Sequence, residues 1–377
     1  MSKPKLAFIV NTDWFFVSHR LSLAEVAIAA GFDVHLITNV SNKESVIKQA
    51  GVNLHHLPIS RKGTNPFSEL GTVVRLAKIL ASIQPNILHL VTPKGVIYGG
   101  VLAKFLPKSK VVAAISGLGS VFSDTQGSGL LMRAVVSTLY RVALSGRSTQ
   151  VIFQNSDDQR EISRLVNIPP HNSHLIRGSG VPLNRYQFLP EPDGVVTVTF
   201  ASRLLWEKGI GEFIKAANQL AGLGVRARWI VSGQFDQGNP TAITEEEFRA
   251  LDVNGVIEYV GYSEDIPNLF RESHVIVLPS YYKEGIPRVL LEAAACGRPV
   301  VTTDMPGCRE AIEPGITGEV IPARDVSSLA DVIQKLIESP QMRQEMGKRG
   351  RELAEREFDV DLVAARHLEI YRKLSAY

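Results

Sequence analysis

The chain of 377 residues is long enough for two domains of ordinary size, each with its own hydrophobic core. Hydrophobic residues make up 45% of it and charged residues 21%, a balance that excludes a disordered chain. Two cysteines, Cys296 and Cys308, exclude a disulfide scaffold and favour a reducing cytosol, and no Cys/His cluster has the spacing of a metal site. We therefore expect no structural zinc site, and we expect no cofactor.

Charge is unevenly distributed along the chain. Residues 1–190 contain 20 Lys and Arg against 9 Asp and Glu, a net charge of +11, whereas the remainder has 21 against 29, a net charge of −8. The asymmetry favours an anionic partner for the first half, such as lipid headgroups, a diphosphate or nucleic acid. A solvated basic surface explains it equally well, and nucleic acid is the least favoured partner because no recognised binding motif is present.

No stretch has the length of a targeting or membrane-spanning element. The first residues carry too short an apolar run for a signal peptide. The uncharged stretch 111–123 is shorter than the roughly 18 residues that would indicate a membrane span. We therefore expect a cytoplasmic protein.

Short apolar runs typical of strands alternate with helical patterns in the first half. The helical pattern over 17–31 ends at a glycine suited to a helix C-cap. Strands that alternate with helices predict a parallel sheet with crossover helices, and hence a doubly wound α/β domain over 1–185. The predicted strands span 5–11, 33–39, 53–59, 86–92, 111–117 and 150–155.

The same rhythm restarts in the second half and predicts a second Rossmann-like domain over 195–357. The proline-rich stretch 182–195 between the halves indicates a linker. An amphipathic helix over 358–377 follows the second sheet, and we expect it to pack back across the domain seam. Two such domains facing each other would enclose a central cleft. The predicted strands span 195–203, 228–233, 257–261, 275–280, 299–304 and 318–322.

Two acidic residues mark the candidate site of the second domain. Ligands of open α/β sheets bind beyond the carboxyl ends of the strands, and Glu284 lies in the loop after the strand 275–280. Pro287 can serve as the first helical residue, and the free N–H groups of that helix favour an anion. Glu292 lies about one and a half turns farther on, where it could accept hydrogen bonds from ribose hydroxyls while Glu284 reaches a sugar. Pairing of Glu292 with an Arg inside the fold is the alternative.

Two basic residues follow the first strand of the second domain. Arg203 and Lys208 lie at its carboxyl end, ahead of a helical pattern. There they could hold a diphosphate and neutralise it as its bond to the sugar breaks. The alternative is that both residues are solvated surface charges of a loop. The two acids on the same side of the sheet argue against that alternative.

The segments 202–209, 279–310 and 315–325 together resemble the retaining GT-B glycosyltransferases of family 4. That family has two acids separated by seven residues, here Glu284 and Glu292, and an Arg and a Lys before the first helix of the second domain. The resemblance implies two Rossmann-like domains, a nucleotide-sugar held mainly by the second, and no required metal.

The resemblance also implies individual roles. Glu284 would contact the donor sugar, Glu292 the ribose, and Arg203 with Lys208 the diphosphate, so that Glu284, Lys208 and Arg203 form the catalytic set. Further donor-binding groups would come from Gly233, Gly285, Ile286, Pro287, Arg288, Val289 and Leu290.

The first half resembles a subgroup of this family. Its segments FFVSHR, HLVTPKG, SGLGSVF and VIFQN are similar to those of enzymes that add a sugar, commonly an N-acetylated hexosamine, to undecaprenyl-diphosphate-linked acceptors. The resemblance implies transfer from a UDP-sugar during polysaccharide, O-antigen or glycan assembly, at the cytoplasmic face of the inner membrane. Many family members have a His where this chain has Ser116, so the resemblance assigns no general base.

Four residues of the first half are candidates for the acceptor side. His19 follows the first strand, although a single His is more often a structural hydrogen-bonding group. Lys94 could meet a diphosphate or be solvated at the surface. Ser116 and Gly117 begin a glycine-rich turn that could bring backbone N–H groups close to a substrate.

The stretch 129–147 has an apolar stripe, and its only charges are three arginines. A basic amphipathic helix can lie on an anionic bilayer, so the stretch favours peripheral membrane association. A crossover helix that covers a sheet has the same pattern and is the better-supported alternative.

Two other function classes fit the architecture. A sugar-nucleotide 2-epimerase would need acid–base side chains around the sugar C2, and the first half offers no convincing set of carboxylates. A non-enzymatic sugar-binding protein has little need for paired cations at a diphosphate.

Overall fold

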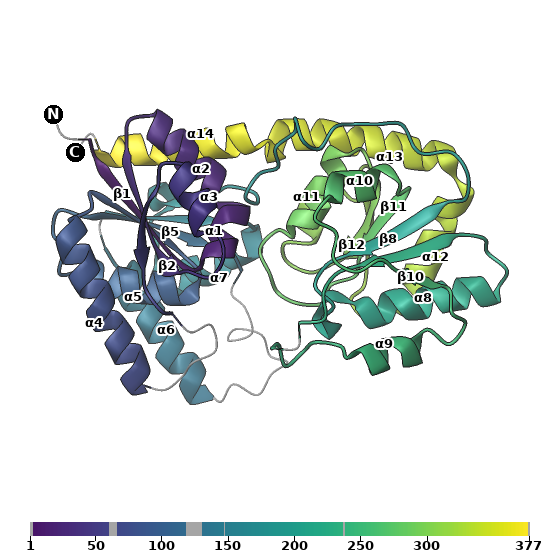
Figure 1. The fold of residues 1–377 in the computed structure, drawn as a ribbon, viewed down its shortest axis with the longest axis horizontal. Helices are drawn as coiled ribbons and strands as arrows, with labels where there is room; N and C mark the ends of the chain where they lie inside the picture. Colours follow the sequence, from purple (N-terminus) through teal and green to yellow (C-terminus); the bar gives the residue numbers. More distant parts are fainter. Residues whose placement is uncertain (1–2, 60–65, 118–129, 147, 237, 376–377) are drawn as a thin grey trace. The chain divides into compact units, whose positions relative to one another are not determined.

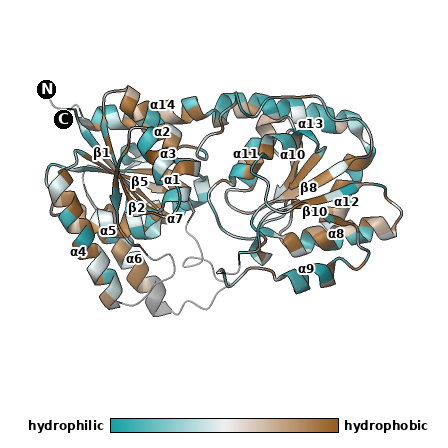
Figure 2. Ribbon diagram, in the orientation of Figure 1, coloured by the Kyte–Doolittle hydropathy of each residue, from teal (hydrophilic) through white to brown (hydrophobic). Residues whose placement is uncertain are grey.

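The computed structural model describes residues 3–59, 66–117, 130–146, 148–236 and 238–375, which form two compact units (Figure 1). The first unit comprises Met1–Gly180 and Val360–Tyr377, and the second comprises Val181–Asp359. Each has a parallel sheet covered by helices, which confirms the predicted doubly wound α/β class. Figure 2 shows largely hydrophobic strands inside each unit.

The sheet of the first unit has seven parallel strands in the order β3-β2-β1-β4-β5-β6-β7. Six of them match predicted strands, and the short β7 was not predicted. The strands are β1 (Lys5–Thr12), β2 (Asp33–Asn39), β3 (Asn53–His56), β4 (Ile87–Val91), β5 (Lys110–Ile115), β6 (Thr149–Phe153) and β7 (Ser173–Leu175).

Alternation along β1 supplies both faces of this sheet. Leu6 and Phe8 enter one hydrophobic core, whereas Ala7 and Ile9 enter the other. The first core is shared with α1 (Asp13–His19), α2 (Leu21–Ala29), α3 (Glu44–Gln49) and α14 (Val360–Ser375). The second is shared with α4 (Pro66–Ile83), α5 (Pro93–Ala103), α6 (Leu130–Leu144) and α7 (Ser156–Val166).

The predicted helix over 17–31 is two helices in the structure. α1 ends at His19 and α2 begins at Leu21, because Arg20 between them has φ −136° and ψ −9°, outside the helical region. The Arg20 side chain is buried, and its Nη1 donates to the carbonyl of His19 at 2.9 Å. The predicted stop is correct, since Gly31 follows α2 with φ +94°.

Asp13, at the start of α1, joins β1 to the segment after β2. Its buried carboxylate accepts hydrogen bonds from the backbone N–H groups of Ser41, Asn42 and Lys43 at 2.7 to 3.1 Å, and from the Ser41 hydroxyl. Burial by itself raises the pKa of Asp13, but these hydrogen bonds outweigh it and hold the pKa below its usual value.

The second unit has six parallel strands in the order β10-β9-β8-β11-β12-β13, all of which match predicted strands. They are β8 (Thr197–Ala201), β9 (Arg228–Ser232), β10 (Ile257–Tyr259), β11 (Val275–Leu278), β12 (Val300–Thr303) and β13 (Gly318–Ile321). The covering helices are α8 (Ile210–Gly222), α9 (Glu245–Leu251), α10 (Ile266–Arg271), α11 (Arg288–Ala295), α12 (Val326–Glu338) and α13 (Pro340–Leu353).

The proline-rich stretch 182–195 belongs to the second unit and is tied to it by several contacts. Glu191 forms a buried ion pair with Arg343 at 2.9 Å. The buried Arg298 guanidinium donates to the carbonyls of Leu189 and Pro190. These contacts hold the stretch in place although its composition is that of a linker.

Within the described ranges, no helix is long and apolar enough to cross a membrane. The same residues contain no group of His, Cys, Asp and Glu that could hold a metal ion.

We expect Asp13→Asn to lower the free energy of unfolding by about 1–3 kcal/mol at pH 7, because it weakens the acceptor of several buried backbone donors. A depressed pKa in the folded state means that the carboxylate stabilises the protein above its unfolded pKa, near 4, and that this contribution is lost as the pH falls. Urea unfolding of wild type and variant at pH 7 and near pH 3 measures both effects. Glu44→Gln, which alters an exposed ion pair with Lys48, is the control. A deficit that does not shrink in acid would contradict this account.

Candidate active site

The candidate site contains a close pair of opposite charges, Lys208 and Glu284. The Lys208 Nζ lies 2.6 and 2.5 Å from the two carboxylate oxygens of Glu284, and both side chains are largely buried. Lys208 ends a short helix, Trp206–Lys208, after β8, and Glu284 lies in the loop after β11. Because β8 and β11 are neighbours in the parallel sheet, their carboxyl ends bring the two side chains together.

Close backbone approach makes this pairing possible. Gly209 has φ +80°, and a Cβ there would lie 2.2 Å from the carbonyl oxygen of Pro279, so only glycine fits. The Ser280 hydroxyl bonds both to the carbonyl of Glu207 at 3.1 Å and to the Glu284 carboxylate at 3.0 Å. The loop after β8 is therefore fastened to the end of β11.

The loop after β12 packs against Glu284 from another side. Gly307 has φ +82°, and a Cβ there would lie 2.1 Å from the carbonyl oxygen of Gly285. Cys308 next to it is buried, and burial together with the charge of Glu284 raises the pKa of its thiol to about 12. The thiol is therefore neutral and takes no part as a nucleophile.

Glu292 lies in α11 with only 7% of its surface exposed. Its Oε1 accepts hydrogen bonds from the Tyr186 hydroxyl and from the Arg288 Nε, both at 2.7 Å. The Arg pairing considered as an alternative from the sequence is thus present in this structure. Burial and the negative charge of Glu292 raise the pKa of Tyr186 well above its usual range, so Tyr186 remains a donor.

The start of α11 differs by one residue from the sequence prediction. Pro287 is the N-cap, with ψ 123°, and the helix begins at Arg288. A residue with this ψ lies outside the helical region, so Pro287 cannot be the first helical residue. The end is as predicted, because Gly297 follows the helix with φ +70°.

The remaining donor-side candidates differ in how they are placed. Arg203 is exposed and pairs with Asp236 at 3.1 Å, so its contact is distinct from the Lys208–Glu284 pair. Leu290 is fully buried in the hydrophobic core, and Val289 packs against that core. Their side chains contribute to stability. The buried Gly285, Ile286 and Pro287 form the turn between Glu284 and α11.

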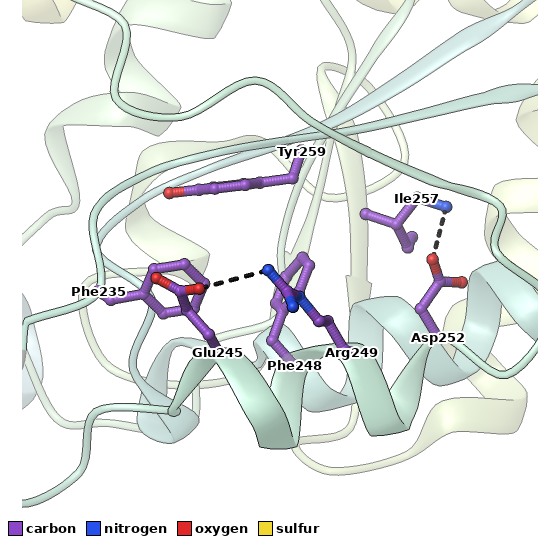
Figure 3. A pocket seen from close by; sticks show the side chains of 7 residues that line it. All are labelled: Phe235, Glu245, Phe248, Arg249, Asp252, Ile257 and Tyr259. Atoms are coloured by element: carbon purple, nitrogen blue, oxygen red, sulfur yellow. Dashed lines mark hydrogen bonds and ion pairs between the residues drawn. The ribbon is translucent and has the colours of Figure 1, made fainter.

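Gly233 follows β9 where two loops nearly touch. A Cβ there would lie 1.9 Å from the carbonyl oxygen of Ser202. The Tyr259 hydroxyl donates to the Gly233 carbonyl at 2.9 Å, and Tyr259 also lines a pocket of about 400 Å³ with Phe235 and Phe248. Figure 3 shows the three rings gathered around this pocket, with Glu245 and Arg249 directed at each other. Tyr259 therefore holds the loop that contains Gly233.

In the first unit, His19 and Lys94 both have local partners. The His19 ring stacks on Phe15 with 4.2 Å between centroids, and its Nδ1 lies 3.2 Å from the Phe15 carbonyl oxygen. Lys94, at the start of α5, forms an ion pair with Glu69 of α4 at 2.6 Å. The carboxylate of Glu69 also accepts a hydrogen bond from Tyr98.

Ser116 and Gly117 follow β5, and both are partly exposed. The Ser116 hydroxyl lies 3.5 Å from Nη2 of the buried Arg20, and Gly117 has φ +102°. Residues 118–120 of the predicted glycine-rich turn lie outside the described residues. Sequence reasoning did not single out Arg20, which the structure places beside Ser116.

Three further residues of the second unit were not predicted as site residues from the sequence. Tyr186 lies in a stretch that has the composition of a linker. Ser280 and Gly307 flank the Glu284 loop. The only sequence signal for either is that Gly307 follows closely after a predicted strand, a position that indicates a tight turn.

Comparison with known proteins identifies the two halves separately. Residues 186–353 match the family model "Glycosyl transferases group 1", and residues 5–155 match "Glycosyl transferase 4-like". Together the two matches cover most of the chain, and they confirm the resemblance drawn from its motifs.

Curated relatives match over nearly the whole length. The N,N'-diacetylbacillosaminyl-diphospho-undecaprenol alpha-1,3-N-acetylgalactosaminyltransferase of Campylobacter jejuni is 27% identical, with 91% of each chain covered. The capsular polysaccharide biosynthesis glycosyltransferase CapM of Staphylococcus aureus is 23% identical, with 88% of this chain and 87% of the relative covered.

Solved structures share the fold at lower identity. Sucrose-phosphate synthase from Thermosynechococcus elongatus superposes with a TM-score of 0.80 at 20% identity, covering 99% of this chain and all of the other. Anabaena HepE in complex with UDP-glucose superposes with a TM-score of 0.75 at 18% identity and the same coverage. These matches confirm the predicted GT-B fold.

We expect Lys208→Met to lower the free energy of unfolding by about 2–3 kcal/mol in the absence of ligand, because it leaves Glu284 buried without its counter-charge. The double variant Lys208→Met/Glu284→Gln should lose less than the sum of the two single variants. Urea unfolding of all four proteins measures the coupling. The same cycle on the exposed pair Arg249 and Glu245 should be close to additive. Additive losses at Lys208 and Glu284 would show that the pair is not coupled.

Proposed function

Because the chain belongs to the retaining GT-B glycosyltransferases of family 4, we propose that it moves a sugar from a UDP-sugar to a lipid-linked saccharide acceptor. The observation that carries the proposal is the buried Lys208–Glu284 pair directly before the N-terminus of α11. It joins a cation to a carboxylate close to the start of α11, where the helix dipole favours an anionic leaving group. We propose this function in preference to the epimerase and the non-enzymatic sugar-binding protein.

In this proposal the residues of the second unit bind the donor. Lys208 and Arg203 neutralise the diphosphate, which gains negative charge as its bond to the sugar breaks. Glu284 accepts hydrogen bonds from the sugar hydroxyls and orients the Lys208 ammonium. Glu292 accepts hydrogen bonds from the ribose. Gly233 and the turn Gly285–Pro287 supply backbone groups and leave room for the nucleotide.

Retention of configuration follows from a reaction on one face of the sugar. The bond from C1 to the phosphate oxygen breaks, and the bond from C1 to the acceptor hydroxyl forms on the same side. The acceptor proton passes to the departing phosphate oxygen, so no protein base is required. Ser116 at the position where many relatives have a His is consistent with that route.

The proposed acceptor is a lipid-linked saccharide. Motifs of the first half support an undecaprenyl-diphosphate-linked saccharide, and the Campylobacter relative is named for transfer of N-acetylgalactosamine to such a lipid. We propose an N-acetylhexosamine or a related hexose as the transferred sugar. His19, Lys94, Ser116 and Gly117 are the proposed acceptor-side residues. The enzyme would act in polysaccharide assembly, as the name of CapM implies for that relative. We propose that it works at the cytoplasmic face of the inner membrane.

UDP should raise the thermal midpoint of the purified protein, whereas GDP and ADP should not. A ligand at 100 times its dissociation constant adds about 2.7 kcal/mol to the free energy of unfolding. Glu292→Ala should remove the shift because it deletes the proposed ribose acceptor. Glu258→Ala, which breaks an exposed pair with Arg228 on the same unit, should retain it. A shift with GDP or ADP instead would replace the donor, and no shift with any nucleotide would contradict the donor site.

Glu284→Gln should reduce kcat about 100-fold or more, since it removes the charge that holds Lys208 toward the diphosphate. The change preserves size but leaves the buried Lys208 without its counter-charge, so the unfolding midpoint of the variant is measured beside its rate to show that it is folded. Release of UDP from a panel of UDP-sugars with a lipid-linked acceptor measures the rate, and Glu258→Gln is the control. Activity close to that of wild type in Glu284→Gln would refute its catalytic role.

A further inference from the structure

We propose that the outer surface of α4 and α6 docks the protein on an anionic lipid surface. This α4–α6 face consists of Phe67, Leu70 and Val74 of α4 and Val135, Leu139 and Val142 of α6, with the basic residues beside them. The purpose of the docking rests on the proposed lipid-linked acceptor, whereas the docking itself rests on the exposure and the charge of this face.

The α4 part of the face is a stripe of large apolar side chains. Phe67 is 87% exposed, Leu70 62% and Val74 47%. Their spacing of three and four residues places them on one side of the helix. The buried residues Leu76, Leu80 and Ile83 lie on the opposite side, where they pack against the sheet. The apolar stripe is therefore additional to the side that builds the core.

The α6 part repeats this arrangement. Val135, Leu139 and Val142 are exposed at spacings of four and three residues, whereas Tyr140 and Leu144 are buried in the core. The sequence favoured a crossover helix as the explanation of this segment, and the buried side fulfils that role. The exposed side provides a second apolar stripe that the core does not use.

The two stripes belong to one layer of helices. α5 packs against both α4 and α6, and all three share the core on the same side of the first sheet (Figure 1). α4 follows β3 and α6 follows β5, so each helix begins at the carboxyl edge of the sheet. Lys94 and Ser116 lie at that same edge. A membrane against the α4–α6 face would bring a lipid-linked acceptor to the proposed acceptor residues.

The positive charge around the α4–α6 face favours an anionic lipid surface as its partner. Residues 60–147 contain 11 Lys and Arg but only 2 Asp and Glu. Of the two acids, Glu69 is paired with Lys94, and Asp124 lies outside the described residues. Arg75 and Lys78 on α4 and Arg141 on α6 are exposed beside the apolar stripes. Apolar side chains among basic ones are the pattern that binds the interface of an anionic bilayer.

The same charge argues against a second copy of the chain on this face. Two copies docked through it would bring two strongly basic surfaces together, and like charges repel. A purely electrostatic partner such as nucleic acid would leave the exposed Phe67 and Leu70 without a function.

Vesicle co-sedimentation of the full chain tests the proposal. We expect binding to vesicles with 30% phosphatidylglycerol, little binding to phosphatidylcholine alone, and weaker binding as the salt concentration rises. Phe67→Ser/Leu70→Ser should weaken binding at least 10-fold, and Arg75→Gln/Lys78→Gln should weaken it and reduce its salt dependence. Leu223→Ser/Val253→Ser, which removes two exposed apolar side chains of the second unit, should leave binding unchanged. All these positions are exposed, so the variants should fold.

Three results would overturn the proposal. They are no preference for anionic vesicles, equal loss in the control variant, and a dimer in solution that Phe67→Ser/Leu70→Ser dissociates. Transfer assays separate this proposal from the proposed function. Phe67→Ser/Leu70→Ser should lose at least 10-fold in activity on a long-chain acceptor in vesicles and retain activity on a short-chain, water-soluble acceptor. Vesicle binding by a wild-type protein that is inactive on both acceptors would refute the proposed function and leave the docking face standing.

Discussion

The ion pair between Lys208 and Glu284 is the contact around which the second unit's site is arranged. Neither charge could be buried alone, because an isolated ion loses its hydration without compensation. Their pairing therefore demands that the loops after β8 and β11 meet closely. Gly209 permits that approach, and Gly307 lets the loop after β12 pack against the Glu284 loop, since a Cβ at either position would collide with the backbone of the loop it faces.

The same rule explains Glu292. A carboxylate inside an otherwise apolar helix needs partners, and it has them in Arg288 one turn away and in Tyr186, more than a hundred residues away in sequence. The Tyr186 contact fastens the proline-rich stretch to α11 as part of the second unit. A ribose in the proposed donor complex would have to share or replace these partners, which links donor binding to the packing of that stretch.

The core of the first unit contains the buried histidines His89 and His367. Burial holds the pKa of His367 near 3 and that of His89 well below its usual value, so both are neutral, and Tyr371 hydrogen-bonds to His89 at 2.6 Å. Arg20 is the buried cation of this region, and it contacts the carbonyl of His19 and lies near the Ser116 hydroxyl. Most other positive charge is on the surface, where it can act on a partner. This distribution is the physical basis for the proposed α4–α6 face.

The sequence by itself determined the doubly wound class, all but the short strand β7, and the pairing of two acids with two cations as a candidate donor site. Strand and helix patterns are local, and loops after parallel strands converge at one edge, so these features need no long-range information. Only the tertiary structure decided that Lys208 holds Glu284, that Tyr186 holds Glu292, that Arg203 pairs with Asp236, and that the helical pattern breaks at Arg20. Each of these depends on contacts or backbone angles set by distant packing, which no periodicity in the chain encodes.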